Sequence, residues 1–252
     1  MKLKFMTYNI WGGQSYAEYL DGKPAELCKR DVAPVAEVIR QTGAEIVSLN
    51  EIFNCDKYGN QTKKIANLAG FKYYRFAPAL ARLDLGGYYG NALLSKYPIV
   101  SLTEKKIPAE TGVRLSEGRS VMCATIDLGE KHIDIIVGHF GLVDAEKERA
   151  TGAVLDFASI SDNECVFMGD MNSNRDSDHV KRLQKVFQIT NEKEIITWPT
   201  EYVPPEKQTF SSPLWNRQID YIFVSNGIKV NKTEAVYSLA SDHRALCAEV
   251  EI

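Results

Sequence analysis

The stretch ECVFMGDMN, from Glu164 to Asn172, begins as an apolar strand and ends on an aspartate and an asparagine. A buried strand has no use for such an end, because removing a carboxylate from water without a partner is costly. Gly169 lets another backbone approach closely, and Asp170 and Asn172 lie two residues apart, so an extended segment presents both on one face. A carboxylate that holds metal or water beside an amide that donates to a phosphoryl oxygen is a sensible catalytic pair. A turn built on Asp and Asn is the alternative interpretation.

The same pattern occurs five more times along the chain, each time as a strand-like run that stops on a polar residue. These runs are MTYN ending at Asn9, VSLNE ending at Glu51, IVGH ending at His139, RQID ending at Asp220 and ASDH ending at His243. A fold that gathers these ends at one rim would concentrate carboxylates, amides and imidazoles in one pocket. The pattern therefore predicts a hydrolytic metal site.

The composition is that of an ordinary globular chain, with 252 residues, 44% of them hydrophobic and 25% charged. The net charge of -3 provides no basic excess for tight, nonspecific binding of duplex nucleic acid. Nucleic acid stays among the possible substrates, because local patches and a bound cation offset acidity. Five scattered cysteines without a CxxC pair are expected to be reduced. We expect no signal peptide, no membrane span, no obligate protein partner and a cytoplasmic location.

Hydrophobic periodicity and glycine positions outline the secondary structure. Strands are expected over residues 2–10, 44–49, 71–76, 99–107, 119–128, 132–137, 164–168, 218–224, 228–237 and 244–252, and helices over 30–41, 63–69, 145–159 and 178–187. Gly43 is expected to close the first helix, and residues 84–90 are expected to form a glycine- and tyrosine-rich loop. Strand–helix units mixed with hairpins in both halves indicate an α/β protein whose two sheets lie face to face with helices outside. We expect one domain spanning residues 1–252.

Two of the strand ends suggest how a metal would be held. A hard divalent cation such as magnesium takes oxygen ligands, often one or two carboxylates with waters and substrate phosphate. Glu51 at the end of a buried strand, beside Asn9 from the first strand, would supply such ligands. A helix cap or a turn is the ordinary alternative for both residues.

The histidines suggest acid–base chemistry. A histidine needs an acceptor on one ring nitrogen to present the other usefully, and Asp220 is placed to orient His243 in this way. A surface hydrogen bond is the alternative. Arg119 is expected to reach a phosphate or to form a structural salt bridge. The aromatic side chains expected in loops would stack on a ring of the substrate or pack locally; they are Trp11, Tyr88, Tyr89, Trp198 and Trp215.

Together these motifs resemble the endonuclease/exonuclease/phosphatase superfamily, whose members include deoxyribonuclease-I-like and exonuclease III/AP endonuclease-related proteins. The motifs follow the family's order over essentially the whole chain: TYN at 7–9, Glu51, GNALLSKYP at 90–98, His139, GDMN at 169–172, IDY at 219–221 and SDH at 241–243. The resemblance implies a four-layer α/β sandwich of two mixed, mostly antiparallel sheets with helices outside. It also implies phosphoester hydrolysis that depends on Mg²⁺ or Mn²⁺.

The resemblance also implies a role for each position. Glu51 would be the main metal ligand with Asn9 beside it, and Asp242 would support the metal or the neighbouring network. Asp170 and Asn172 would position or activate the attacking water and contact the phosphate.

His139 and His243 would face the scissile phosphate, with Asp220 orienting His243; either a histidine or Asp170 would be the general base. We assign Arg119 and Asn91 to substrate binding. Two neighbours depart from the family pattern, Asn50 where Gln is usual and Gly138 where Thr is commoner, and both concern substrate fit.

The function expected from the sequence is therefore a metal-dependent phosphodiesterase of the nuclease type, in which water attacks phosphorus. A phosphatase or a phospholipid head-group hydrolase, acting on phosphoinositides or sphingomyelin, is the alternative within the same superfamily. A non-catalytic binding module is a different class, but such a module should have lost some metal or histidine positions. None of them is missing from this chain.

Overall fold

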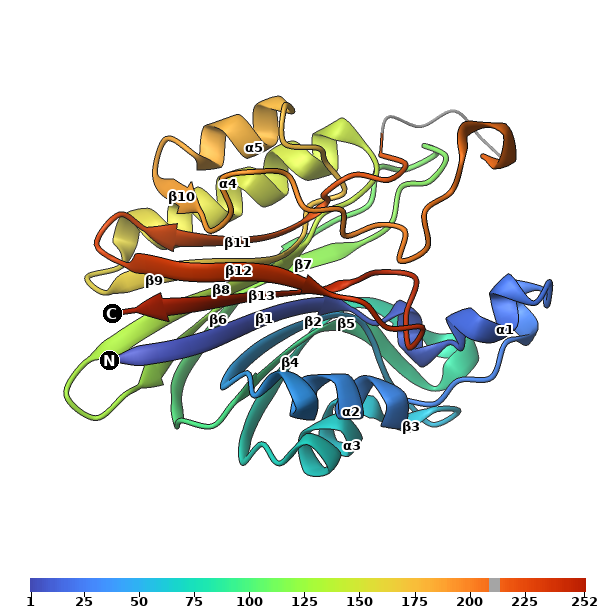
Figure 1. Ribbon diagram of the computed structural model, residues 1–252, viewed down its shortest axis with the longest axis horizontal. Helices are drawn as coiled ribbons and strands as arrows, with labels where there is room; N and C mark the ends of the chain where they lie inside the picture. Colours follow the sequence, from blue (N-terminus) through green and yellow to red (C-terminus); the bar gives the residue numbers. More distant parts are fainter. Residues whose placement is uncertain (209–213) are drawn as a thin grey trace.

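Two β-sheets packed face to face form the centre of the molecule in this computed structural model, which describes residues 1–208 and 214–252 (Figure 1). The first sheet has the strand order β12-β13-β1-β2-β5-β4, and β3 pairs with β2. Its strands are β1 (Lys2–Asn9), β2 (Ile46–Cys55), β3 (Gly59–Asn60), β4 (Tyr73–Arg82), β5 (Gly87–Ser95), β12 (Lys229–Val236) and β13 (Ala245–Glu251).

The second sheet has the strand order β10-β11-β9-β8-β7-β6. Its strands are β6 (Ile99–Ile107), β7 (Arg119–Asp127), β8 (His132–His139), β9 (Glu164–Asp170), β10 (Phe187–Ile189) and β11 (Asp220–Ser225). The pairs β1–β2 and β8–β9 are parallel, and the other neighbouring pairs are antiparallel. The expected mixed, mostly antiparallel sheets are therefore confirmed.

Helices cover the outer face of each sheet and complete the four expected layers (Figure 1). Helices α2 (Ala33–Thr42) and α3 (Gln61–Ala69) pack on the first sheet, and α4 (Asp144–Ile160) and α5 (Asp178–Leu183) pack on the second. Gly43 ends α2 with a φ of 67°, the left-handed conformation that favours glycine at this position. The short helix α1 (Tyr16–Leu20) and the 3-10 turns at Trp11–Gly13, Ala25–Leu27, Leu83–Leu85 and Pro205–Lys207 lie in connections.

Side chains that alternate along each strand divide the interior into layers, because successive residues of a strand point to opposite faces. On β1, Leu3 and Phe5 face the second sheet, whereas Met6 and Tyr8 face α2 and its surroundings. The space between the sheets is filled by apolar side chains from both, including Ile46, Leu93, Met122, Ile135, Val137, Val166, Met168, Ile222, Leu246 and Ala248. This alternation also fixes which polar residues at the strand ends enter the space between the sheets.

Several expected element boundaries are wrong, each for an identifiable reason. Residues 87–90 belong to β5 and not to a loop, because Gly87 and Gly90 lie where a Cβ would overlap the backbone oxygens of the neighbouring strands. The last expected helix ends at Leu183, and Phe187 starts β10, where its ring packs against Phe223. Strand β2 continues through Glu51 to Cys55 instead of ending before it.

Two further expectations concern cysteine chemistry and the membrane. All five cysteines are free, and four of them are buried, as expected. Among the described residues, no helix is both long and apolar enough to span a membrane.

Candidate active site

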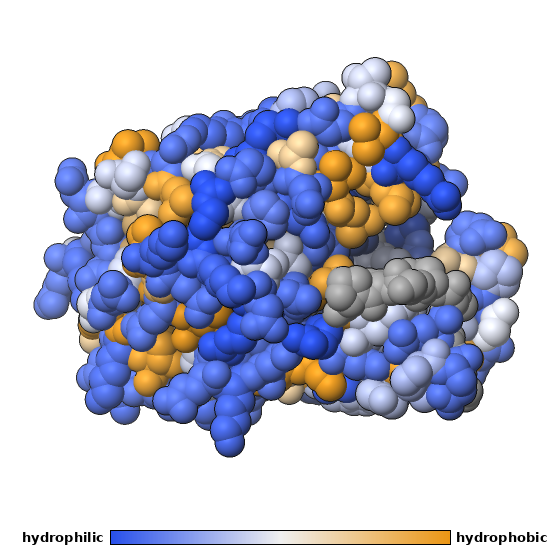
Figure 2. Space-filling view, turned by 90° about the horizontal axis from the view of Figure 1, so that it is seen from above, coloured by the Kyte–Doolittle hydropathy of each residue, from blue (hydrophilic) through white to orange (hydrophobic). Residues whose placement is uncertain are grey.

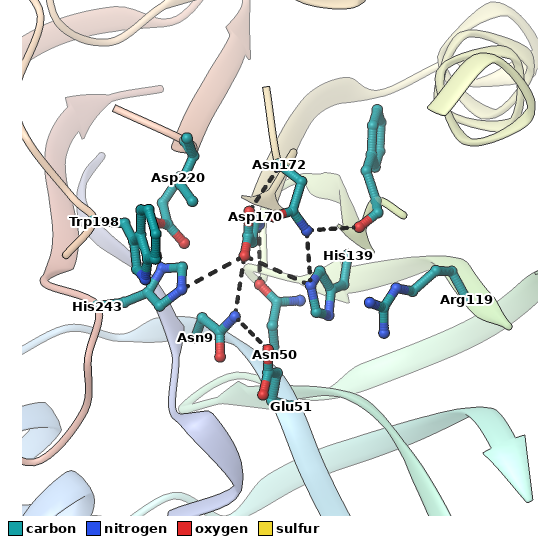
Figure 3. A network of polar contacts seen from close by, with 12 residues as sticks. Asn9, Asn50, Glu51, Arg119, His139, Asp170, Asn172, Trp198, Asp220 and His243 are labelled. Carbon is teal, nitrogen blue, oxygen red and sulfur yellow. Dashed lines mark hydrogen bonds and ion pairs between the residues drawn. The ribbon is translucent and has the colours of Figure 1, made fainter. Parts of the chain in front are cut away.

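The polar strand ends meet at one end of the space between the sheets (Figure 3). The alternation that places Val137, Met168 and Ile222 between the sheets places the residue two positions along on the same face. On β8 and β9 these residues are His139 and Asp170, and on the antiparallel β11 it is Asp220. Each is at most 3% exposed. The gathering that the sequence pattern suggested is therefore observed.

Glu51 reaches the same space through an irregularity in β2. The pairing of β2 with β5 shifts register between Leu49 and Ile52, and Glu51 has a φ of 62°. Such a bulge redirects a side chain that strict alternation would send to the other face. The Glu51 carboxylate accepts a hydrogen bond from the Asn9 amide nitrogen at 3.0 Å. Burial raises the pKa of Glu51, and the negative Asp242 nearby raises it further.

Asp170 lies at the centre of the site. Its Oδ2 accepts a hydrogen bond from the Asn9 amide at 3.0 Å and lies 3.6 Å from His139 Nε2 and 3.8 Å from His243 Nε2. Its Oδ1 accepts the backbone N–H of Asn172 at 2.8 Å. Burial raises the pKa of Asp170, and the negative charge of Asp220 adds to this effect. One carboxylate oxygen thus faces both histidines.

His243 is held by Asp220, as the sequence predicts, at 2.9 Å between Nδ1 and Oδ2. Burial alone would lower the pKa of His243, but the negative charges of Asp220, Asp242 and Asp170 outweigh it and raise the pKa to about 10. This imidazole therefore carries a proton at neutral pH. Trp198 supports the arrangement, because its indole N–H donates to Asp242 Oδ2 at 3.2 Å and its ring lies beside His243.

His139 has the opposite electrostatic setting. Burial lowers its pKa well below the usual value, and the positive charges of Arg119 and His243 lower it further. Asn172 has a φ of 46°, and its amide nitrogen donates to the Phe140 carbonyl at 2.9 Å and lies 3.3 Å from His139 Nε2. The two histidines of the site therefore differ in charge at neutral pH, His139 being neutral and His243 protonated.

The two residues assigned to substrate binding lie in different places. Arg119 is 6% exposed and pairs with Glu117 at 2.6 Å, and its guanidinium group points toward the site (Figure 3). Asn91 is 1% exposed, and its amide nitrogen donates to the Ser120 carbonyl at 3.0 Å. Its oxygen accepts from Asn50 at 2.8 Å, and it lines none of the described pockets. Asn91 thus lies behind the site, and the expected contact with substrate stays a prediction without support in this geometry.

A pocket of about 690 Å³ opens in front of these residues. Its polar wall contains Glu51, Asp170, Asn172, Asp242 and His243, and its apolar wall contains Trp11, Leu115, Leu142, Trp198, Leu214 and Ile219. Leu115 and Leu142 are exposed at 64% and 45%, so they form part of an apolar rim. Figure 2 shows apolar surface of this kind beside a hollow toward the same end of the molecule.

A model of the endonuclease/exonuclease/phosphatase family matches residues 6–243, which include all of these site residues. This chain belongs to that family. The match extends over most of the chain, so the resemblance seen in the motif order is confirmed. Members of the family are phosphoester hydrolases.

Solved structures show the same fold in other members. A family protein from Beutenbergia cavernae has a TM-score of 0.80 at 21% identity, covering 100% of this chain and 72% of that one. A mannosyl-6-phosphatase from Bacteroides thetaiotaomicron has a TM-score of 0.68 at 14% identity, covering 99% of this chain and 100% of that one. The catalytic domain of human Nocturnin, with bound sulfate, has a TM-score of 0.67 at 17% identity, covering 99% and 93%. No curated protein matches the chain.

The donors in this family member suit a hard divalent cation. Glu51 and Asp242 both line the pocket, and the hydrogen bond from Asn9 leaves oxygen lone pairs of Glu51 free for a cation. A second group, Asp170, Asp220 and His243, has potential ligand atoms within 4.8 Å of one another. The hydrogen bond between Asp220 and His243 already accounts for part of that closeness. Oxygen donors at the pocket wall therefore fit magnesium or manganese best at Glu51.

Sequence reasoning missed one residue that organises the site. Asn50 is fully buried, its Oδ1 accepts the backbone N–H of Asp170 at 3.0 Å, and its Nδ2 donates to the Gly138 carbonyl at 3.1 Å. These hydrogen bonds connect the first sheet to β8 and β9 next to the site. The sequence shows Asn50 only as a departure from the family pattern, which indicates a difference but not this bridging position.

Proposed function

We propose that this protein hydrolyses compact phosphodiesters and that its activity depends on Mg²⁺ or Mn²⁺. The observation that carries the proposal is the position of Asp170, whose Oδ2 faces both His139 and His243 at the wall of a pocket that also contains Glu51. A carboxylate and two imidazoles around one point can bind, orient and exchange protons with a water and a phosphate group. The candidate residues keep the roles expected from the sequence, with the refinements that follow.

In this proposal Asp170 accepts the proton of the attacking water. A general base works best when its pKa lies near the operating pH, and burial raises the pKa of Asp170 toward that range. His243 is protonated at neutral pH, so it serves as a donor to the phosphate or the leaving oxygen and not as the base. Asp220 keeps the imidazole in place through Nδ1, which leaves Nε2 facing the site.

The remaining polar groups would stabilise charge on the phosphoryl oxygens. Asn172 and the neutral His139 supply hydrogen bonds, and Arg119 supplies a positive charge from the side of β7. Glu51 would hold the divalent cation, with Asp242 and Asn9 supporting it. Such a cation, when bound, offsets the negative charge that develops in the transition state.

The shape of the site supports a compact diester. Glu51 and Trp11 line both the 690 Å³ pocket and a second, adjoining pocket of about 250 Å³. A phosphorus held near Glu51 would therefore have room for one ester group in each pocket. Pockets of this size suit small molecules, and the net charge of -3 offers no track for a long polyanion.

The test is hydrolysis of bis-p-nitrophenyl phosphate with Mg²⁺ and then Mn²⁺, measured for the native protein and for Glu51→Ala and His243→Ala. Both variants should lose activity by at least about 100-fold while keeping their circular dichroism spectra. Glu37→Ala, at a half-buried position in α2, and His132→Ala, at an exposed position at the start of β8, change residues outside the site. They are the controls and should keep full activity. Full activity in either site variant would refute the assignment. If p-nitrophenyl phosphate were hydrolysed faster than bis-p-nitrophenyl phosphate, the proposed substrate class would change from phosphodiesters to phosphomonoesters.

We also propose that residues 1–252 act as one domain in the cytoplasm. The apolar side chains between the sheets form one continuous cluster drawn from both, which supports a single folding unit. Five free cysteines support a reducing compartment. Limited proteolysis and thermal unfolding would test the first proposal, through a single protected fragment and a single transition.

A further inference from the structure

The second pocket, which we call the arginine pocket, adjoins the larger one, because Glu51 and Trp11 line both. Its lining residues are Trp11, Gln14, Arg30, Glu51, Phe53, Arg82, Tyr89, Glu117 and Arg119. Three guanidinium groups from three different parts of the chain therefore line a space of about 250 Å³. None of the sequence motifs predicts this convergence.

Arg30 is a fixed cation without a carboxylate partner among the described residues. Its Nη1 donates to the backbone carbonyls of Gly12 at 3.1 Å and Trp11 at 3.4 Å. Its guanidinium carbon lies 5.0 Å from the ring centroids of both Phe53 and Tyr58, which holds the group in place by cation–π contacts. A side chain at Gly12 would overlap Arg30 Nη1, so the glycine makes this position possible.

Two buried donors in the same pocket lack an acceptor within the part of the chain that the structure describes. Arg119 is only 6% exposed, and its Nε has no hydrogen-bond partner among these residues. Tyr89 is 7% exposed; its hydroxyl oxygen accepts from Arg119 at 3.4 Å, and no acceptor for the hydroxyl hydrogen is found. Buried donors are normally paired, so these two point to a ligand that accepts hydrogen bonds.

The charges in the arginine pocket favour an anion. Three guanidinium groups there outnumber the carboxylates of Glu51 and Glu117. Glu117 already pairs with Arg119 at 2.6 Å, and Glu51 is the residue proposed to hold the cation. Arg82 also donates to both carboxylate oxygens of Asp84, from Nε at 2.9 Å and from Nη2 at 2.7 Å, but the Asp84 side chain is 61% exposed, so a phosphate can compete with it for these donors. Guanidinium groups recognise phosphate through pairs of parallel hydrogen bonds.

We propose that the arginine pocket binds a second, terminal phosphate group of the substrate, next to the phosphodiester that is hydrolysed. This inference rests on the proposed function and extends it to the substrate class: a phosphodiester that also carries a phosphate monoester. A terminal group suits the site because the three arginines surround one space and do not follow a groove. An internal phosphate of a long nucleic acid would need basic groups continuing beyond it.

The first experiment measures binding without catalysis. Inorganic phosphate is titrated into the protein by calorimetry in buffer containing EDTA, where the acidic metal site repels anions and the arginine pocket does not. Arg82→Gln should weaken binding at least about tenfold, as the loss of a charge-assisted hydrogen bond does. Arg30→Lys keeps the charge but not the planar fork, and should weaken binding as well. Arg75→Gln, an exposed arginine on the same strand β4 outside the pocket, is the matched control and should bind like the native protein.

The second experiment compares thymidine 5′-(p-nitrophenyl phosphate) with the same compound bearing a 3′-phosphate. The native protein should show a kcat/KM at least about tenfold higher for the 3′-phosphate compound, and Arg82→Gln should remove most of that preference. Melting temperatures verify that each variant is folded.

The outcomes separate the two proposals. Phosphate binding that depends on Arg82, in a protein that hydrolyses neither compound, would refute the proposed function and keep the anion site. Hydrolysis without any preference, together with phosphate binding unchanged in Arg82→Gln and Arg30→Lys, would refute the anion site and keep the function. Single-stranded oligonucleotides cleaved faster than the 3′-phosphate compound would overturn the terminal phosphate in favour of a continuing backbone.

Discussion

Replacement of Asn50 by alanine should damage both stability and catalysis, because this buried amide connects the two sheets at the site. Its Oδ1 accepts the Asp170 backbone N–H at 3.0 Å, and its Nδ2 donates to Asn91 Oδ1 at 2.8 Å and to the Gly138 carbonyl at 3.1 Å. Asn50→Ala removes these three hydrogen bonds and leaves their partners in a buried place without water.

The magnitude follows from the number of groups left unpaired. A buried donor or acceptor that loses its partner costs about 1–3 kcal/mol, so three of them lower the free energy of unfolding by about 3–9 kcal/mol. Since Asp170 would lose the bond that positions its backbone, a displacement of about 1 Å would lower kcat by roughly 100-fold.

Urea unfolding measures the stability of the variant, and kcat for bis-p-nitrophenyl phosphate with Mg²⁺ measures the catalytic effect. Asn54→Ala is the matched control, because Asn54 lies on the same strand β2 and bonds to Thr62 through both ends of its amide, without contact to the site. The control should lose stability and keep its kcat. The reasoning is refuted if Asn50→Ala keeps the native kcat and unfolding midpoint, or if Asn54→Ala loses kcat equally.

Three further predictions concern other parts of the site. Gly169→Ala should lower the free energy of unfolding by about 3 kcal/mol or more in urea titrations, because its Cβ would overlap the Gly138 carbonyl oxygen across β8 and β9, whereas Gly152→Ala meets open space and should be tolerated. Asp220→Asn should move the alkaline limb of the kcat–pH profile down by about 1–3 pH units, since the pKa of His243 loses its strongest support; an unmoved limb would contradict the assigned pair. Mg²⁺ should raise the melting temperature more as pH rises from about 5 to 8, because the raised pKa of Glu51 makes protons compete with the cation, and Glu51→Gln should abolish most of this gain.

The native imidazolium also predicts how stability depends on pH. The pKa of His243 is raised in the folded state, so the protonated form contributes stability that is fully present below about pH 6.5, the usual histidine pKa. This contribution is lost as the pH rises through about 10. Chemical unfolding of the chelated protein at pH 6 and 9 should show the loss, and His243→Gln should reduce it.

Much of the fold and of the candidate site follows from local sequence patterns. The apolar alternation of β1, β8 and β9 places every second residue between the sheets, so it predicts that the polar residues ending those strands share one space. The motif order then indicates the family and the four layers. The structural role of glycines is harder to predict from the sequence, because Gly87 and Gly90 lie at close contacts between strands where the sequence suggested a loop.

The sequence by itself determined which side chains are candidates for the site, because each follows from a short-range pattern of apolar and polar residues. Only the tertiary structure decided how they meet. Asn9 and Asp170 are hydrogen-bonded although 161 positions separate them, and Glu51 enters the site through a bulge that breaks the alternation of β2. Two other features, the arginine pocket and the hydrogen bonds by which Asn50 joins the two sheets, likewise depend on sheet register and on how the sheets pack. Such long-range contacts leave no periodic trace in a single sequence, because they join residues whose own neighbours look ordinary.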